Sequence, residues 1–201
     1  MKNLIVKIVA ICVATVLMFS LCGCAKGNKE NNVLIKDAKL EESTYKLGDT
    51  MGDYTLTDFE GNTISFSEIL KEKEAIVLNF WFSNCTPCKN EFPYLQNASK
   101  KYNDKLTVVA INPIDIKESK IEKFISENNI TLPVVKGDPA WEEALSLQGY
   151  PTTVVVDRYG KIALYHVGAL TEDGEFEKIF EFFTADDYEH TVVKNVNEII
   201  K

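Results

Sequence analysis

Two cysteines separated by two residues are the side chains in this sequence best suited to redox chemistry. Cys85 and Cys88 enclose a threonine and a proline. A proline is well tolerated in the first turn of a helix, where the backbone N–H groups have no partner within the helix. The partial positive charge at a helix N-terminus stabilises a thiolate. The spacing therefore predicts that Cys85 lies at the exposed tip of a helix as a nucleophile with a lowered pKa. Cys88, one turn further in, would resolve the mixed disulfide.

Other roles for this pair remain open. A structural zinc site needs four ligands, but His166 and His190 are far from the usual spacing of three to five residues between histidine ligands. An inert disulfide across so short a loop contributes little loop-closure entropy. Cu(I) favours thiolates, and His166 is the one candidate for a third ligand. We otherwise expect His166 to be structural, His190 to have no role, and the protein to hold no metal and no cofactor.

The N-terminus predicts export from the cytoplasm. Lys2 and Lys7 are basic, and residues 8–21 carry no charge. This uncharged stretch suits a signal peptide better than a membrane span, which needs about 20 apolar residues. Cys24 follows a glycine, with a leucine three positions before it, and this pattern resembles the lipobox of bacterial lipoproteins. We expect removal of residues 1–23 and lipidation of Cys24. An uncleaved anchor or plain secretion remains open, and both also place the rest of the chain outside the cytoplasm.

This processing would leave few free cysteines in the mature protein. Cys12 and Cys22 would leave with the signal peptide, and Cys24 would be consumed by the lipid. Cys85 and Cys88 would then be the only thiols of the mature protein. A chain of this size does not need a disulfide across a four-residue loop for stability, so redox exchange explains the pair best.

The mature chain is expected to contain a tether and one domain. Residues 24–43 are rich in Lys, Asn and Glu, which is typical of a flexible linker. Residues 44–201 are long enough for one domain with its own core, although 171–201 are less clearly assigned. Without Lys2 and Lys7, 20 basic residues face 30 acidic ones, a net charge of about −10. This charge argues against nucleic-acid binding and against charge-driven binding to anionic lipids. A monomer is the default expectation.

The pattern of apolar residues predicts an α/β sandwich. Residues 54–59 and 63–66 alternate around a Gly-Asn turn and predict a β-hairpin. The continuous apolar runs at 75–82 and 106–111 predict strands covered on both faces. Further strands are predicted at 132–135, 152–156 and 162–166, and helices at 87–102, 116–128, 141–147, 174–183 and 192–200. Strand–helix–strand units followed by a strand pair and a helix form a layered α/β domain.

Residues 79–93 (NFWFSNCTPCKNEFP) resemble the active-site signature of the TlpA/ResA family, membrane-tethered thioredoxin-like thiol–disulfide oxidoreductases. The similarity covers roughly residues 45–170 and includes 149–157 (GYPTTVVVD). It implies a thioredoxin-like sandwich in which helices flank a central mixed β-sheet, with an N-terminal β-hairpin and a helical insert over 116–133. Relatives usually carry Trp directly before the first cysteine, where this chain has Asn84. That departure leaves partner docking and the exact redox potential open.

The resemblance also implies roles for four residues outside the cysteine pair. Pro151 matches the family's cis-proline, which packs against the cysteines and, with Tyr150 before it, offers backbone to an extended peptide substrate. Glu91 matches an acidic residue that tunes the cysteine pKa values and assists proton transfer. A solvated first-turn glutamate is its alternative. Asn79 stands where cytoplasmic thioredoxins carry a buried aspartate, so proton handling would fall to Glu91 or to water.

The function implied by this resemblance is that of a lipid-anchored reductase on the extracytoplasmic face of the cell membrane. Its dithiol would reduce disulfides in extracytoplasmic proteins, and a membrane thiol electron donor would reduce it again. A thiol oxidase or isomerase with reversed electron flow remains open, as does a Cu(I)-handling protein. The sequence does not select a physiological substrate.

Overall fold

The computed structural model describes residues 39–40 and 43–201. The predicted signal peptide with Cys12 and Cys22, the predicted lipidation site Cys24 and most of the predicted tether lie outside the described residues. Among the helices that are described, none has the length and apolar character needed to cross a membrane.

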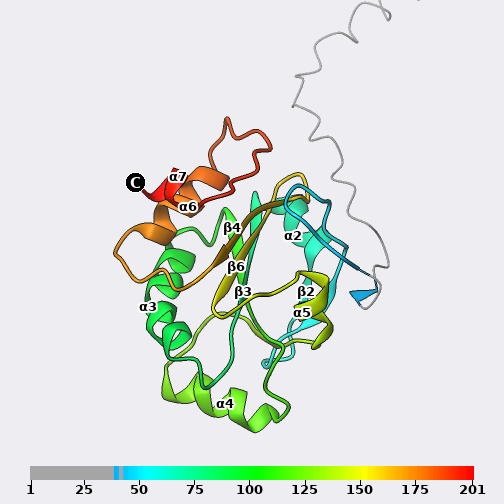
Figure 1. The fold of residues 1–201 in the computed structure, drawn as a ribbon, viewed down its shortest axis with the longest axis vertical. Coiled ribbons are helices and arrows are strands. Elements are labelled where there is room, and N and C mark those ends of the chain that lie inside the picture. Colours follow the sequence, from blue (N-terminus) through cyan, green and yellow to red (C-terminus); the bar gives the residue numbers. More distant parts are fainter. Residues whose placement is uncertain (1–38, 41–42) are drawn as a thin grey trace, which may run out of the picture. The chain divides into compact units, whose positions relative to one another are not determined.

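A five-stranded mixed sheet forms the centre of the domain (Figure 1). Its strands are β3 (Ala75–Phe80), β4 (Leu106–Asn112), β5 (Val134–Lys136), β6 (Thr152–Asp157) and β7 (Ile162–Val167), in the order β5-β4-β3-β6-β7. β3 is parallel to β4 and antiparallel to β6, while β4 pairs in parallel with β5 and β6 antiparallel with β7. Every residue of β3 and β6 is buried, and for β3 the continuous apolar run predicts this. The predicted strands are confirmed to within two residues.

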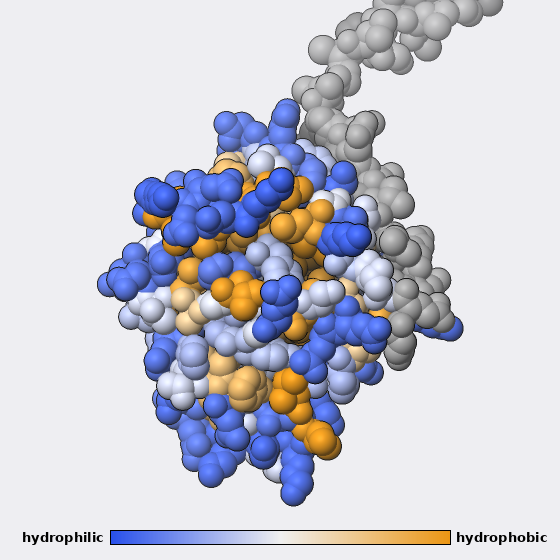
Figure 2. All heavy atoms as spheres, in the orientation of Figure 1, coloured by the Kyte–Doolittle hydropathy of each residue, from blue (hydrophilic) through white to orange (hydrophobic). Residues whose placement is uncertain are grey.

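Helices cover both faces of the sheet. They are α2 (Phe66–Glu72), α3 (Thr86–Lys101), α4 (Glu118–Glu127), α5 (Ala140–Ala144), α6 (Glu175–Phe183) and α7 (Asn197–Ile200). On one face, Phe92 of α3, Phe124 of α4 and Phe180 of α6 join a hydrophobic core with side chains of the strands. On the other face, Phe66 of α2 and Trp141 of α5 join a second core. The predicted α/β sandwich is confirmed, and α4 is the expected helical insert, between β4 and β5. Hydrophilic residues cover much of the visible surface (Figure 2).

The N-terminal hairpin is confirmed, but the helix that follows it was not predicted. β1 (Thr55–Thr57) and β2 (Thr63–Ser65) pair antiparallel. Phe66, which we expected to end the second strand, instead begins α2. The backbone N–H of Glu68 donates to Oγ of Ser65 at 3.4 Å. Ser-x-x-Glu before an apolar segment is the capping-box signature of a helix start, so the signal was present in the sequence.

The C-terminal segment differs from the prediction. Of the helix predicted over 192–200, only the last four residues are helical, as α7. Val193 instead lies beside β7, where its N–H donates to the carbonyl oxygen of Ala163 at 2.8 Å and it forms a parallel bridge with Leu164. The helix predicted over 174–183 is confirmed as α6.

A buried carboxylate explains this course of the chain. Asp157, the last residue of β6, is fully buried. Its Oδ2 accepts a hydrogen bond from the Tyr188 hydroxyl at 2.9 Å and lies 2.7 Å from Nδ1 of His190. These contacts fix the segment after α6 against the β6–β7 turn, because a buried carboxylate must be satisfied by donors. His190, for which we predicted no role, therefore has a structural one.

We expect Tyr188→Phe to lower the free energy of unfolding by about 2 kcal/mol, because it removes a donor from the buried Asp157 carboxylate. Urea denaturation followed by circular dichroism measures the change. Tyr94→Phe, which removes a hydroxyl from a half-buried tyrosine on α3, serves as the control. Equal losses in the two variants would contradict this role of Tyr188.

Candidate active site

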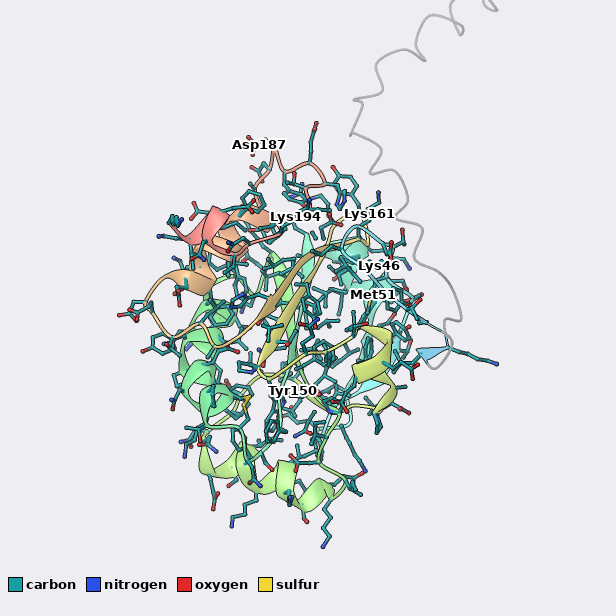
Figure 3. All side chains as sticks on the ribbon, viewed as in Figure 1. Lys46, Met51, Tyr150, Lys161, Asp187 and Lys194 are labelled. Atoms are coloured by element: carbon teal, nitrogen blue, oxygen red, sulfur yellow. A yellow bond between two sulfur atoms is a disulfide. The ribbon has the colours of Figure 1, made fainter. Side chains whose placement is uncertain are left out.

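The cysteine pair lies where the chain turns from β3 into α3. Cys85 is the N-cap residue of α3, and Cys88 lies in its first turn, with a proline between them. The two cysteines form a disulfide with their Cα atoms 5.2 Å apart. Figure 3 shows this disulfide at the same end of the domain as Tyr150. The backbone N–H of Cys88 points at Sγ of Cys85, 3.2 Å away. In the reduced protein this N–H and the helix dipole would stabilise a Cys85 thiolate.

Cys85 is less exposed than we predicted. Only 4 % of the residue is accessible, against 1 % for Cys88. Its side chain turns back over the first turn of α3, because its sulfur accepts the Cys88 N–H. The rings of Phe82 and Tyr150 meet edge to face, 5.5 Å apart, and pack against the hydrophobic core that contains both cysteines. The prediction of an exposed tip is therefore wrong for the disulfide form.

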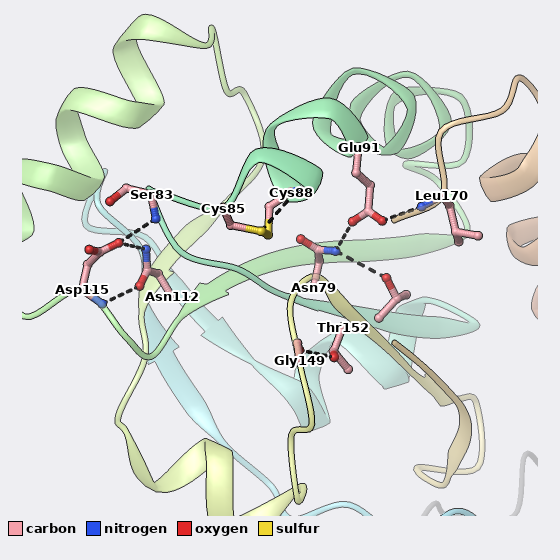
Figure 4. The surroundings of a disulfide bond; sticks show 11 residues. Asn79, Ser83, Cys85, Cys88, Glu91, Asn112, Asp115, Gly149, Thr152 and Leu170 are labelled. Carbon is pink, nitrogen blue, oxygen red and sulfur yellow. Dashed lines mark hydrogen bonds between the residues drawn. A yellow bond between two sulfur atoms is a disulfide. The ribbon is translucent and has the colours of Figure 1, made fainter. Parts of the chain in front are cut away.

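Glu91 is a buried carboxyl group on the same face of α3 as Cys88. The two residues are three positions apart, so their side chains are neighbours on the helix. Glu91 is only 1 % exposed. Its Oε1 accepts from Nδ2 of Asn79 at 2.7 Å, and its Oε2 accepts from the backbone N–H of Leu170 at 2.9 Å (Figure 4). The alternative of a solvated first-turn glutamate is wrong.

Burial governs the protonation of this carboxyl group. Burial raises the pKa of Glu91 to about 7, although the hydrogen bonds from Leu170 and Asn79 lower it; the negative charge of Glu175 raises it further. An acid with a pKa near neutral can both accept and return a proton at physiological pH. Such a shifted carboxyl beside a cysteine pair is typical of a functional site.

Asn79 has a role that the sequence did not reveal. We expected it only to mark the absence of a buried aspartate. In the structure it donates to Glu91, and its Nδ2 also lies 3.4 Å from Oγ1 of Thr153 on β6. A polar side chain within the apolar β3 was the available signal, since a buried amide must find partners. Leu170 had no such signal, because it acts through its backbone N–H.

The loop before β6 also lies beside the disulfide. The Tyr150–Pro151 peptide bond is cis, as the resemblance implied. The Tyr150 hydroxyl donates to Oε1 of Glu142 on α5 at 3.0 Å, and burial, followed by this carboxylate, raises the pKa of Tyr150. The carbonyl oxygen of Pro151 accepts from the N–H of Gly168 at 2.9 Å. These contacts hold both ends of the cis-proline loop.

His166 was the candidate third ligand for a metal held by the two cysteines. Within 39–40 and 43–201, no group of three or more His, Cys, Asp or Glu side chains is arranged to hold a metal ion. His166 lies on β7, paired with Thr153, and its burial lowers its pKa.

Comparison with known proteins agrees with this geometry. The family model described as Redoxin matches residues 46–181. Thioredoxin-like protein YneN of Bacillus subtilis (strain 168) is 28 % identical over 168 residues, which is 83 % of this chain and 95 % of that protein. Thiol-disulfide oxidoreductase ResA of the same organism is 32 % identical over 129 residues, covering 62 % and 69 %. The crystal structure of StoA from Bacillus subtilis superposes with a TM-score of 0.54 at 26 % identity, covering 64 % of this chain and 93 % of that chain.

Proposed function

Because this chain belongs to the Redoxin family, as a ResA-like thiol–disulfide oxidoreductase with the thioredoxin fold, we propose that Cys85 and Cys88 are its redox-active pair and that their dithiol form reduces disulfides in extracytoplasmic proteins. One observation carries the assignment of the pair. The Cys85 sulfur caps α3 and faces the Cys88 N–H, which favours Cys85 as the thiolate nucleophile.

The proposed reaction proceeds in two exchanges. The Cys85 thiolate attacks one sulfur of the partner disulfide, forms a mixed disulfide and releases the other partner sulfur as a thiolate. The Cys88 thiolate then attacks Cys85 Sγ, breaks the mixed disulfide and releases the second partner thiolate. Two electrons pass to the partner, and the Cys85–Cys88 disulfide is formed. Glu91 accepts the proton that Cys88 must lose, and Asn79 and Leu170 hold its carboxyl group in place.

The partner is proposed to approach along the cis-proline loop. Within residues 43–201, the backbone N–H and C=O of Tyr150 form no backbone hydrogen bond, so both can pair with an extended polypeptide. Tyr150 and Pro151 would thus bind the substrate next to the sulfur that attacks it. The formal net charge of −8 does not favour nucleic acid as a partner, and we propose that the protein acts as a monomer.

The direction of electron flow rests on the family resemblance, and the midpoint potential of the Cys85/Cys88 couple tests it. We expect a value near or below about −230 mV, toward the thioredoxin end of the known range. A soluble chain that begins after Cys24, equilibrated in glutathione or dithiothreitol buffers, provides the measurement. A potential above about −180 mV would instead favour a thiol oxidase or isomerase. A membrane thiol donor would then no longer be needed as the source of electrons.

We also propose that residues 1–23 are a lipoprotein signal peptide, that lipidated Cys24 holds the protein on the extracytoplasmic face of the membrane, and that 24–43 tether the domain formed by 44–201. The start of the family match at residue 46 supports this division. Cys24→Ala should move the protein from the membrane to the soluble fraction and abolish labelling with a fatty-acid analogue. Cys22→Ala is the matched control, because Cys22 lacks the preceding small residue. A Cys24→Ala protein that stays in the membrane would exclude this anchor.

A further inference from the structure

A second buried carboxylate lies near the disulfide, and the exchange steps proposed above do not use it. Asp115 stands between β4 and α4 and is 7 % exposed. Its Oδ2 accepts from the backbone N–H of Ser83 at 2.7 Å and from Nδ2 of Asn112 at 2.9 Å. Its Oδ1 lies 3.5 Å from Nζ of Lys120. Burial raises the pKa of Asp115, but these donors together hold it below its usual value, so the group is ionised near neutral pH.

The sheet fixes the position of this carboxylate. Asn112 is the last residue of β4, a strand inside the sheet, and it is fully buried. Besides donating to the carboxylate, its side chain accepts from two backbone N–H groups of the following loop, those of Ile114 at 3.2 Å and Asp115 at 2.9 Å. Asp115 is therefore tied to the end of a strand through both its side chain and its backbone. A group held in this way can in turn hold another segment of the chain.

Ser83, the backbone partner of Asp115, lies in the turn that carries the nucleophile. The N–H of Cys85 donates to the carbonyl oxygen of Phe82 at 3.1 Å, the hydrogen bond of a four-residue turn. Ser83 is the second residue of this turn, and Cys85 is both its last residue and the N-cap of α3. Figure 4 shows Asp115 and Ser83 on one side of the disulfide and Glu91 on the other. Asp115 thus binds the turn from which the Cys85 side chain extends.

This contact matters most when the disulfide is reduced. In the oxidised protein the bond to Cys88 holds the Cys85 sulfur, which lies 3.2 Å from the Cys88 N–H. Once that bond is broken, the Cys85 side chain can rotate, and the backbone of the turn determines which rotamers face the N–H. A hydrogen bond from the turn to a fixed carboxylate limits this freedom, because hydrogen bonds to an ionised acceptor are stronger than neutral ones.

We propose that Asp115 is a positioning residue for the exchange reaction. The hydrogen bond that it accepts from Ser83 holds the turn over residues 82–85, so the Cys85 sulfur of the dithiol form still faces the Cys88 N–H. This inference rests on the proposed exchange function and adds a group on the Cys85 side of the pair. The two buried carboxyl groups then have different roles. Glu91 accepts a proton from Cys88, whereas Asp115 stays ionised and acts through the backbone of the turn.

The alkylation profile of Cys85 tests this proposal. In a Cys88→Ser background Cys85 is the only cysteine among residues 43–201, and its rate of reaction with iodoacetamide against pH gives the midpoint at which the thiolate forms. Asp115→Ala should raise this midpoint by about one pH unit, because the thiolate loses part of its hydrogen bond with the N–H of residue 88. Asp115→Asn keeps an oxygen that can accept from Ser83 and should not raise the midpoint.

A matched control separates positioning from general stability. Asp53 also accepts a backbone N–H, that of Ser67 on α2, at 3.0 Å. Asp53→Ala and Asp115→Ala should both lower the free energy of unfolding, but only Asp115→Ala should move the midpoint. An unchanged midpoint in Asp115→Ala, or an equal rise in Asp53→Ala, would overturn the positioning role. A midpoint that falls in both Asp115 variants would also overturn it, because the carboxylate would then act by its charge alone.

A measurement on the wild-type protein applies even if Asp115→Ala does not fold. The Ser83 amide proton, followed by NMR, should stay protected from solvent exchange when the disulfide is reduced, and loss of this protection would overturn the proposal. Reduction of bis(2-hydroxyethyl) disulfide by wild type reports the exchange function separately. If wild type reacts but the midpoint does not move in Asp115→Ala, the positioning role fails and the exchange function stands. A wild-type protein that does not react would overturn both.

Discussion

Cys85→Ser will lower the rate of insulin reduction by dithiothreitol to that of the reaction without protein. A serine hydroxyl is not ionised at neutral pH and cannot displace a sulfur, so the first exchange does not occur. The loss should be complete, because Cys88 is the only other cysteine among the described residues. Turbidity of the precipitating insulin B chain measures the rate. Turnover retained by Cys85→Ser would refute its assignment as the nucleophile.

Cys88→Ser should behave differently, because it removes the second exchange only. Cys85 would still attack partner disulfides, and the mixed disulfides would then accumulate for lack of a resolving thiol. Non-reducing electrophoresis and mass spectrometry after expression in the native compartment would identify the trapped proteins. The double variant Cys85→Ser/Cys88→Ser is the control and should trap none. If Cys88→Ser traps no more than the double variant, the order of the two cysteines is wrong.

The position of the cysteines could be predicted because it depends on local rules. Consecutive residues indicate a buried strand, then a short turn, then a proline in the first turn of a helix. The burial of Cys85 could not be predicted in the same way. The core that contains both cysteines is also packed by the ring of Tyr150, which the fold brings to Phe82 from a distant part of the sequence.

Hydrogen bonds between residues far apart in the sequence explain the other differences between the predictions and the structure. Glu91 was found through resemblance, but its burial depends on Asn79 and on the N–H of Leu170, 79 positions away. Asp157 and His190 are separated by 33 positions, and no periodic pattern indicates that they meet. Such contacts follow from the sheet order and the path of the connecting loops, which hydrophobic periodicity does not specify.

Two groups of hydrogen-bonded residues lie on opposite sides of the disulfide (Figure 4). On one side Asn79 and Leu170 donate hydrogen bonds to Glu91, the group that we propose accepts the proton of Cys88. On the other side Asp115 accepts from the Ser83 N–H and so connects the loop after β4 to the segment that leads into Cys85. In each group an asparagine on a strand of the sheet donates a hydrogen bond to the carboxylate, Asn79 on β3 to Glu91 and Asn112 on β4 to Asp115. Both hydrogen-bonded groups thus lie at the end of the sheet that carries the disulfide.

Glu91→Gln will change how stability depends on pH. The pKa of Glu91 rises from 4.5 to about 7 on folding, mainly because it is buried. Below pH 4.5 the group is protonated in both the folded and the unfolded state. Between pH 4.5 and 7 the unfolded state has lost the proton and the folded state has not, so rising pH favours unfolding. Wild type should therefore lose about 3 kcal/mol of unfolding free energy between pH 4 and pH 8, a loss that Glu91→Gln does not share.

Urea denaturation of the oxidised proteins at pH 4 and pH 8 measures this difference. In the oxidised state neither cysteine titrates, so the comparison isolates Glu91. Glutamine can still accept the Leu170 N–H and, if the Asn79 amide turns over, donate to it. The variant therefore keeps a paired side chain. Glu122→Gln, on the exposed face of α4, is the matched control and should retain the wild-type pH dependence. Parallel behaviour of Glu91→Gln and wild type would show that Glu91 does not hold a proton near neutral pH.

A stability change alone would not show that Glu91 takes part in exchange. The reactivity of the Cys88 thiol tests this part, because Glu91 is proposed to accept its proton. In a Cys85→Ser background, the rate of alkylation of Cys88 by iodoacetamide should have an inflection near pH 7, where Glu91 titrates. The additional Glu91→Gln change should remove that inflection. If it alters the stability profile but leaves the alkylation profile unchanged, Glu91 is a buried acid that contributes to the fold and not to the transfer of protons.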